Sequence, residues 1–251
     1  MNQTIKNQLN HKTIREFKDQ KVPKEIVEKV IEVANHTATS SHLQGYSIIH
    51  ITDSSLKEKL SVIAKQEYLA RVPELFIFIV DQYRNHQIGQ QQGVTLEATS
   101  DMNSFVQGFT DACLAAQNAT VAIESFSLGA VYFGSILNDV PQLIKLLNLP
   151  PLTYPVVGVG FGYPNQQPQL KPRLNMSAKL FENGYEIKKD YLNLISEYDE
   201  QLAQYYDLRD SNNRVDNFRD QIVKKLTHSH KSRASFFNHV KSQGFKVNVD
   251  D

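Results

Sequence analysis

Hydrophobic residues recur along the chain with two different periods, and each period predicts one kind of secondary structure. Spacings of three and four residues are typical of a helix with one buried face, whereas short apolar runs are typical of strands. The helical pattern occurs in residues 22–36, 53–64, 101–126 and 138–149. Strand-like runs occupy residues 45–51, 74–81, 129–135 and 154–164. Together they predict an α+β core that ends near residue 164.

Some of these segments carry more detailed signals. The run "ELFIFIVD" at 74–81 is apolar nearly throughout, which predicts a strand covered on both faces. Residues 101–126 form the longest helical pattern, and many of its apolar residues are small, so another helix can approach it closely. Ser55 and Glu58 have the spacing of a capping box at the start of the 53–64 helix.

The chain changes character after residue 164. Residues 165–189 are rich in polar residues and proline, which predicts a loop, and helical patterns return at 191–206, 217–226 and 233–243. We therefore expect a helical C-terminal extension over about 190–251, with no sheet of its own. An extension of this kind packs on its own core or on a partner subunit, so one domain over residues 1–251 is expected.

Composition and charge narrow the possible partners. The 27 Lys and Arg residues balance the 27 Asp and Glu residues, so a broad surface for nucleic acid or an anionic membrane is not expected. The N-terminal residues lack an apolar signal segment, and polar residues interrupt 102–126, which argues against secretion or membrane insertion. We expect a cytoplasmic protein. The single cysteine, Cys113, lies in an apolar run and is predicted to be a buried, inert thiol.

The glycine-rich run "GVGFG" at 158–162 invites comparison with a dinucleotide-binding fingerprint. That motif needs a helix N-terminus directly after the glycines, but Tyr163, Pro164 and a polar loop follow. The glycines are therefore expected to permit close packing or ligand approach along a strand. No metal site is predicted, because the single cysteine and scattered histidines do not form a ligand pattern.

Four short polar stretches are candidates for anion binding, and each also has an ordinary structural interpretation. The stretch "HKTIREF" at 11–17 is either a polar lead-in to the first helix or a set of donors for an anion. Thr39, Ser40 and Ser41 are either loop residues after a helix or neutral donors beside a sugar or phosphate.

The other two stretches lie towards the C-terminus. Lys171 and Arg173 are two residues apart, with a proline between them. They are either a surface pair or part of a cationic phosphate site. Arg209 and Arg214 flank a polar segment. They are either solvated residues at a helix–loop–helix corner or a pair that binds a second anion, such as a nucleotide 2′-phosphate.

Taken in order, the polar and apolar segments resemble the nitroreductase superfamily, and within it the NADPH-dependent flavin and nitro reductases. The strings that carry the resemblance span nearly the whole chain: "HKTIREF", "ATSSHLQGYSIIHITD", "AAQNATVAIESFSLGAVYFGSILND", "YPVVGVGFGYP", "LKPRL", "EYDEQLAQYY" and "SNNR". The resemblance implies a central, mainly antiparallel sheet flanked by helices, a long central helix, and an intertwined homodimer with FMN at each subunit interface.

The resemblance also implies roles for individual residues. Those that match the family's FMN-binding positions are His11, Lys12, Thr13, Arg15, Thr39, Ser40, Ser41, Gln66, Tyr68, Tyr132, Phe133, Gly134, Ser135, Lys171 and Arg173. Arg209 and Arg214 match the pair used for the NADPH 2′-phosphate. The chain departs from the family at Ser135, where relatives carry Gly, and at His42, where an aromatic or apolar residue faces the substrate.

The implied activity is hydride transfer from NADPH through FMN to nitroaromatic, flavin or quinone acceptors in a ping-pong cycle. The flavin carries this chemistry, so no catalytic side chain is assigned. An alternative is a protein that stores or senses FMN with little turnover. A third hypothesis, a helical interaction module without a cofactor, is disfavoured by the ordered set of motifs.

Overall fold

A computed structural model describes residues 1–209 and 217–247. The chain divides into two compact units, one formed by residues 1–167 together with 231–251 and the other by residues 168–230. Residues 231–251, which we assigned to the extension, therefore belong to the same unit as the sheet. The prediction of a single domain over residues 1–251 is not tested by this division and stays a prediction.

The first unit is built on an antiparallel sheet of four strands, in the order β1-β2-β4-β3. Their bounds are β1 (Tyr46–Ile51), β2 (Glu74–Asp81), β3 (Gly129–Phe133) and β4 (Thr153–Gly162). All three neighbouring pairs run antiparallel, which confirms the predicted α+β class and sheet type. In β2 the six residues from Leu75 to Val80 are buried, so this strand is covered on both faces as predicted.

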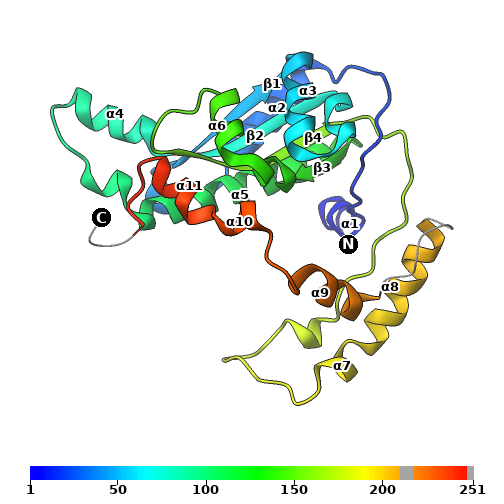
Figure 1. Cartoon of the computed structure of the whole chain (residues 1–251). Helices are drawn as coiled ribbons and strands as arrows, with labels where there is room; N and C mark the ends of the chain where they lie inside the picture. The colour runs from blue at the N-terminus through cyan, green and yellow to red at the C-terminus, as the bar shows by residue number, and fades with distance from the viewer. Residues whose placement is uncertain (210–216, 248–251) are drawn as a thin grey trace. The chain divides into compact units, whose positions relative to one another are not determined.

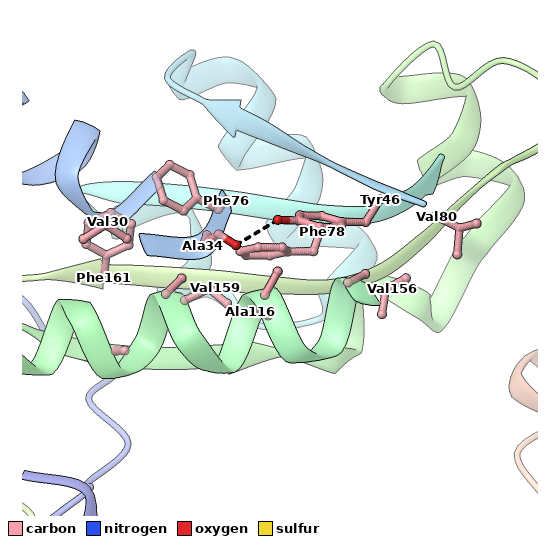
Figure 2. Packing of buried hydrophobic residues seen from close by; sticks show 14 of the residues in the cluster. Val30, Ala34, Tyr46, Phe76, Phe78, Val80, Ala116, Val156, Val159 and Phe161 are labelled. Carbon is pink, nitrogen blue, oxygen red and sulfur yellow. Dashed lines mark hydrogen bonds between the residues drawn. The ribbon is translucent and has the colours of Figure 1, made fainter. Parts of the chain in front are cut away.

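Helices cover the two faces of the sheet (Figure 1). Helices α2 (Lys24–Asn35) and α5 (Met102–Ser125) pack with Phe76, Phe78 and Phe161 in one cluster. Figure 2 shows this packing and the hydrogen bond from the Tyr46 hydroxyl to the Ala34 carbonyl, 2.8 Å long. Helix α3 (Ser54–Ala64) packs against the opposite face with Ile77, Phe133 and Ile136.

Helix ends follow local hydrogen-bonding chemistry, and one predicted cap is wrong. The carboxylate of Asp53, not the hydroxyl of Ser55, caps α3 by accepting the Leu56 amide at 3.1 Å. Both residues have suitable side chains, but a carboxylate also interacts favourably with the helix dipole, and the helix begins one residue after it. Asp101 caps α5, and Asp139 caps α6 (Val140–Leu146).

Two helices were not predicted because their sequences carry little apolar periodicity. Helix α1 (Gln3–Leu9) buries none of its residues, and α4 (Tyr83–Gln91) buries only Gly89. The glycines of β4 have the predicted packing role: a Cβ at Gly160 would lie 2.7 Å from the Phe133 ring. The strand therefore needs glycine there because Phe133 fills the space.

The exposure of Cys113 corrects the prediction of a buried thiol. On α5 the buried positions Ala112, Ala115, Ala116 and Ala119 form the face towards the sheet. Cys113 falls on another face, because successive helical residues differ by about 100°. Within the described part of the chain, no helix is long and apolar enough to cross a lipid bilayer.

Helices α10 (Lys231–Ala234) and α11 (Phe236–Ser242) complete the first unit. The Phe236 ring makes edge contacts with Phe105 of α5 and Tyr154 of β4, at centroid distances of 6.0 and 5.3 Å. Val240 and Phe245 are buried. The helical pattern predicted at 233–243 is confirmed, and its apolar residues fill the core of this unit.

The second unit contains the predicted loop and the remaining helices. It comprises a short 3₁₀ turn at Met176–Ala178 and helices α7 (Tyr191–Leu194), α8 (Ser196–Arg209) and α9 (Phe218–Leu226). The carboxylate of Asp199, only 3% exposed, accepts the Phe218 amide at 2.8 Å and pairs with the Arg219 guanidinium at 2.6 Å. These contacts join α8 to α9.

Candidate functional site

The stretch "HKTIREF" is an extended strip of chain in the first unit, not the start of a helix. The Ile14 amide donates to the Ala130 carbonyl of β3 at 2.9 Å, and Thr13 forms a parallel bridge with the same residue. Ile14 itself is buried, and a Cβ at Gly129 would lie 2.4 Å from it. Glycine in β3 therefore allows Ile14 to dock, which fixes the polar residues on either side of it.

Gln166 secures the same strip from the chain segment that follows β4. Its side-chain oxygen accepts the amides of Arg15 and Glu16 at 3.0 and 2.7 Å. Glu16 forms an ion pair of 3.0 Å with Arg71. Gln166 thus holds the main chain of Arg15. No local pattern predicts this contact, because the partners are 151 positions apart.

Arg15 borders a charged cavity of about 350 Å³. Its walls include the cationic residues Lys18, Lys21 and Arg71, together with the carboxylates of Glu16, Asp19 and Glu74. Of the four cationic residues, only Arg15 was predicted to bind FMN. Four cationic side chains and three carboxylates therefore line the cavity, and its charge is nearly balanced.

His11 lies beside the end of α5. Its Nδ1 is 2.5 Å from a carboxylate oxygen of Glu124, and both side chains are partly buried. The Tyr132 hydroxyl donates to the Gln117 side chain at 3.1 Å. Burial raises the pKa of Tyr132, and the negative charge of Glu124 raises it further although a hydrogen bond with Thr120 opposes the change. Tyr132 is therefore a neutral hydrogen-bonding group at neutral pH.

The residues predicted around 66–68 and 132–135 lie together. The Ser135 hydroxyl donates to the Gln66 side-chain oxygen at 2.9 Å, and the rings of Tyr68 and Phe133 are 5.5 Å apart. Phe133 is fully buried, so it packs in the core and presents no side chain to a ligand. Gly134 is exposed, and no protein atom lies within 4 Å of a Cβ built there.

Arg233 is a residue of this site that the sequence reasoning missed. One guanidinium nitrogen donates to the Gly134 carbonyl at 2.7 Å and to the Asn138 side-chain oxygen at 3.0 Å. The arginine lies 99 positions after Gly134, in a segment with no recognisable motif. It fixes the carbonyl of Gly134, whose main chain is exposed.

The hydroxyl cluster lies in a loop with an unusual backbone. Ser41, His42 and Gln44 all have left-handed φ angles between 49° and 58°, a conformation that most residues avoid. The carboxylate of Asp111, only 1% exposed, accepts the Ser40 and Gly45 amides at 2.9 and 3.3 Å. In the sequence, the signal for Asp111 was an acidic residue within an apolar helical pattern. We interpreted it only as an interruption of that pattern.

The Thr39 hydroxyl supplies a further clue in this loop. Its oxygen is buried and has no hydrogen-bond partner within residues 1–209 and 217–247. Buried polar atoms without a partner are rare because leaving one unpaired costs about 1–3 kcal/mol. A ligand that offers a hydrogen-bonding partner at this loop would remove that cost.

Four of the predicted residues are not placed with the rest. Lys171 and Arg173 belong to the unit of residues 168–230, so their convergence with Arg15 stays a prediction. Arg209 ends α8, but its side chain and the whole of Arg214 lie outside the described residues. The proposed pair for a 2′-phosphate therefore also stays a prediction.

The described residues of the first unit provide hydroxyls, main-chain amides, a cavity of mixed charge and the exposed main chain of Gly134. Groups of this kind bind and orient a flat polar molecule with an anionic end. In the part of the chain that the structure describes, no cluster of three His, Cys, Asp or Glu residues is placed to hold a metal.

Comparison with known proteins identifies the family of this chain. A family model described as "Nitroreductase family" matches residues 9–163, and one described as "Nitroreductase family, C-terminal domain" matches residues 171–248. The chain therefore belongs to the nitroreductase family. An FMN reductase (NADPH) from Bacillus subtilis (strain 168) is 34% identical over 251 residues, which cover 99% of this chain and 100% of that protein.

Solved structures show the same similarity. NfrA1 nitroreductase from B. subtilis has a TM-score of 0.91 at 33% identity, covering 98% of this chain and 100% of that one. An NADPH:FMN oxidoreductase from Vibrio harveyi, complexed with NAD+, has a TM-score of 0.87 at 29% identity, with coverage of 98% and 100%. The predicted nitroreductase fold is confirmed.

Proposed function

We propose that this chain is an FMN-dependent NADPH oxidoreductase that reduces nitroaromatic, flavin or quinone acceptors. The structural observation that carries the proposal is the exposed main chain of Gly134, flanked by the Ser135–Gln66 hydrogen bond and the Tyr68–Phe133 ring pair. The full-length similarity to a relative named FMN reductase (NADPH) supports the same conclusion.

The described residues fit FMN in two respects. The unpaired, buried Thr39 hydroxyl lacks a hydrogen-bonding partner that a polar cofactor provides. The space around Gly134 is open, so a planar ring can lie against its main chain without meeting a side chain there. The remaining members of the proposed FMN set are His11, Lys12, Thr13, Arg15, Ser40, Ser41, Gln66, Tyr68, Tyr132, Phe133, Ser135, Lys171 and Arg173.

When bound, FMN would supply the hydride-transfer chemistry between NADPH and the acceptor, so the protein needs no acid–base dyad of its own. The chain's own residues would bind the cofactor and orient it. Ser135 and Gln66 fix one another, Arg233 fixes the Gly134 carbonyl, and Asp111 fixes the loop that presents Thr39 and Ser40. Arg15, Lys171 and Arg173 provide positive charge for the phosphate, while Arg209 and Arg214 do so for the 2′-phosphate of NADPH.

We also propose that the protein is a homodimer that works in the cytoplasm. Val106 and Leu114 on α5, and Leu43 in the neighbouring loop, each expose about half of their surface or more. An apolar stripe along a long helix is costly to leave in water, and a second copy of the chain would cover it. The exposed Cys113 lies on the same helix and would be shielded by the same contact.

Anaerobic mixing of the purified protein with NADPH tests the activity. We expect a yellow protein whose visible flavin absorbance disappears rapidly with NADPH and returns when a nitroaromatic, free flavin or quinone is added. A yellow protein that NADPH does not bleach would instead support storage or sensing of FMN. A protein that binds no flavin would refute the proposal.

A further inference from the structure

A second cavity lies in the first unit. It occupies about 240 Å³ and is lined by residues of the 3₁₀ turn Gly134–Asp139, helix α6, the start of β4 and the C-terminal helices. Its lining residues are Leu137, Val140, Tyr154, Arg233, Phe236 and His239. All six belong to the same compact unit.

Tyr154 gives this cavity its most informative feature. The side chain is fully buried, yet among the residues that the structure describes its hydroxyl has no hydrogen-bond partner. Edge contacts with Phe105 and Phe236, at 5.5 and 5.3 Å between ring centroids, hold the ring in place. Burial raises the pKa of Tyr154, so the hydroxyl stays protonated and is a donor without an acceptor.

Tyr46 shows how unusual this arrangement is within the same chain. It is also a buried tyrosine, but its hydroxyl donates to the Ala34 carbonyl at 2.8 Å, as Figure 2 shows. Tyr154, in contrast, lines the cavity, so a molecule bound there can supply the partner that its hydroxyl lacks. The orphaned donor therefore indicates a guest that carries an acceptor.

The remaining walls indicate the chemistry of that guest. Leu137, Val140 and Phe236 are apolar, and the edges provide Arg233 and His239. None of the described lining residues is acidic, so the cavity favours an anion. Arginine and tyrosine side chains are both suitable donors to a carboxylate, and the volume is sufficient for a single ring but small for a nucleotide.

We propose that this cavity binds a small monocarboxylate with an aromatic or branched apolar body. The Tyr154 hydroxyl and the Arg233 guanidinium bind the carboxylate, and Leu137, Val140 and Phe236 surround the apolar part. The cavity shares Arg233 with the candidate flavin site, where this arginine fixes the Gly134 carbonyl, but none of its lining residues belongs to the proposed FMN set. The inference stands whether or not the proposed oxidoreductase activity is correct.

Isothermal titration calorimetry of the full-length protein with benzoate tests the proposal. The wild type should bind benzoate, while Tyr154→Phe should bind at least about tenfold more weakly because a hydrogen bond to a charged group is lost. Tyr46→Phe is the matched control, since it removes a hydroxyl from a buried tyrosine outside the cavity and should leave benzoate affinity unchanged. Benzamide, which has a similar shape but no charge, should bind more weakly than benzoate.

Methyl NMR locates the bound molecule. Benzoate should shift the methyl signals of Leu137 and Val140, and these shifts should be lost in Tyr154→Phe. Three results would overturn the proposal: no benzoate binding at about 10 mM, equal affinity in the wild type and Tyr154→Phe, or binding that competes with NADPH and leaves the two methyl signals unmoved.

Discussion

The carboxylate of Asp111 accepts the main-chain amide of Ser40 at 2.9 Å, joining the middle of the long helix α5 to the loop that carries the hydroxyl cluster. The second carboxylate oxygen accepts the Gly45 amide at the other end of that loop. Three residues between these anchors have left-handed φ angles. The buried acid therefore stabilises a backbone conformation that the loop sequence does not favour by itself.

Replacing Asp111 should change the conformation of the loop that carries the hydroxyl cluster and leave the rest of the fold intact. For Asp111→Ala we expect an unfolding free energy lower by about 1–3 kcal/mol, because two amides lose their acceptor, and a reduced ratio of FMN to protein. Urea unfolding and visible absorbance measure the two effects. Asp53→Ala is the control: it removes the cap of α3, should cost roughly 0.5–2 kcal/mol, and should retain full FMN content. Equal FMN content in both variants would contradict the role assigned to the loop.

Arg15 should be required for flavin retention and not for folding. Its side chain borders the charged cavity, while its main-chain contact with Gln166 does not depend on the side chain. Arg15→Ala should therefore purify with the wild-type circular dichroism spectrum but without its yellow colour. Lys18→Ala, a change in the same cavity wall outside the predicted FMN set, should remain yellow. A yellow and fully active Arg15→Ala protein would show that the assignment is wrong.

Gly134 offers a test of the flavin position itself. Since no protein atom lies within 4 Å of a Cβ there, Gly134→Ala should leave the unfolding free energy nearly unchanged. The added methyl group would project into the space proposed for the flavin, so FMN affinity should fall. Fluorescence titration of the apoprotein with FMN measures this change. Gly184→Ala, also in open space, should alter neither property, and unaltered FMN affinity in Gly134→Ala would place the flavin elsewhere.

The two buried tyrosines should respond oppositely to loss of their hydroxyls. Tyr46→Phe removes a hydrogen bond and leaves the Ala34 carbonyl unpaired, so the unfolding free energy should fall by about 1 kcal/mol. Tyr154→Phe removes a donor that has no protein partner, so stability without a ligand should be unchanged or increase by a similar amount. Thermal unfolding of both variants decides the point, and equal destabilisation would mean that Tyr154 has an acceptor.

We predict that Arg209 and Arg214 are responsible for the preference for NADPH over NADH. Each single change to alanine should raise the KM for NADPH and weaken the preference over NADH by about 1–3 kcal/mol, the value of a charged hydrogen bond. Steady-state kinetics with both coenzymes provides the measurement. The KM for NADH should stay nearly constant, because NADH lacks the 2′-phosphate. An unchanged preference in both variants would remove these residues from the coenzyme site.

Secondary-structure elements could be predicted from the sequence alone where the hydrophobic pattern lies within a single segment. The apolar run of β2, the three-and-four spacing of α5 and the helical pattern at 233–243 all persisted in the structure, because each depends on burial of one or both faces of a single segment. Helices α1 and α4 were missed for the same reason, since they bury almost nothing. Ordered motifs also identified the family, which the comparisons confirmed.

Contacts between residues far apart in the sequence are seen only in the three-dimensional structure. It paired His11 with Glu124, joined Asp111 to Ser40, placed Arg233 against Gly134, and left Cys113 exposed on the outer side of α5. These partners are 71–113 positions apart, and periodicity within one segment holds no information about which other segment packs against it. The hydroxyls of Thr39 and Tyr154 show the same limit, because a buried polar atom is recognised as unpaired only when all its neighbours are in place.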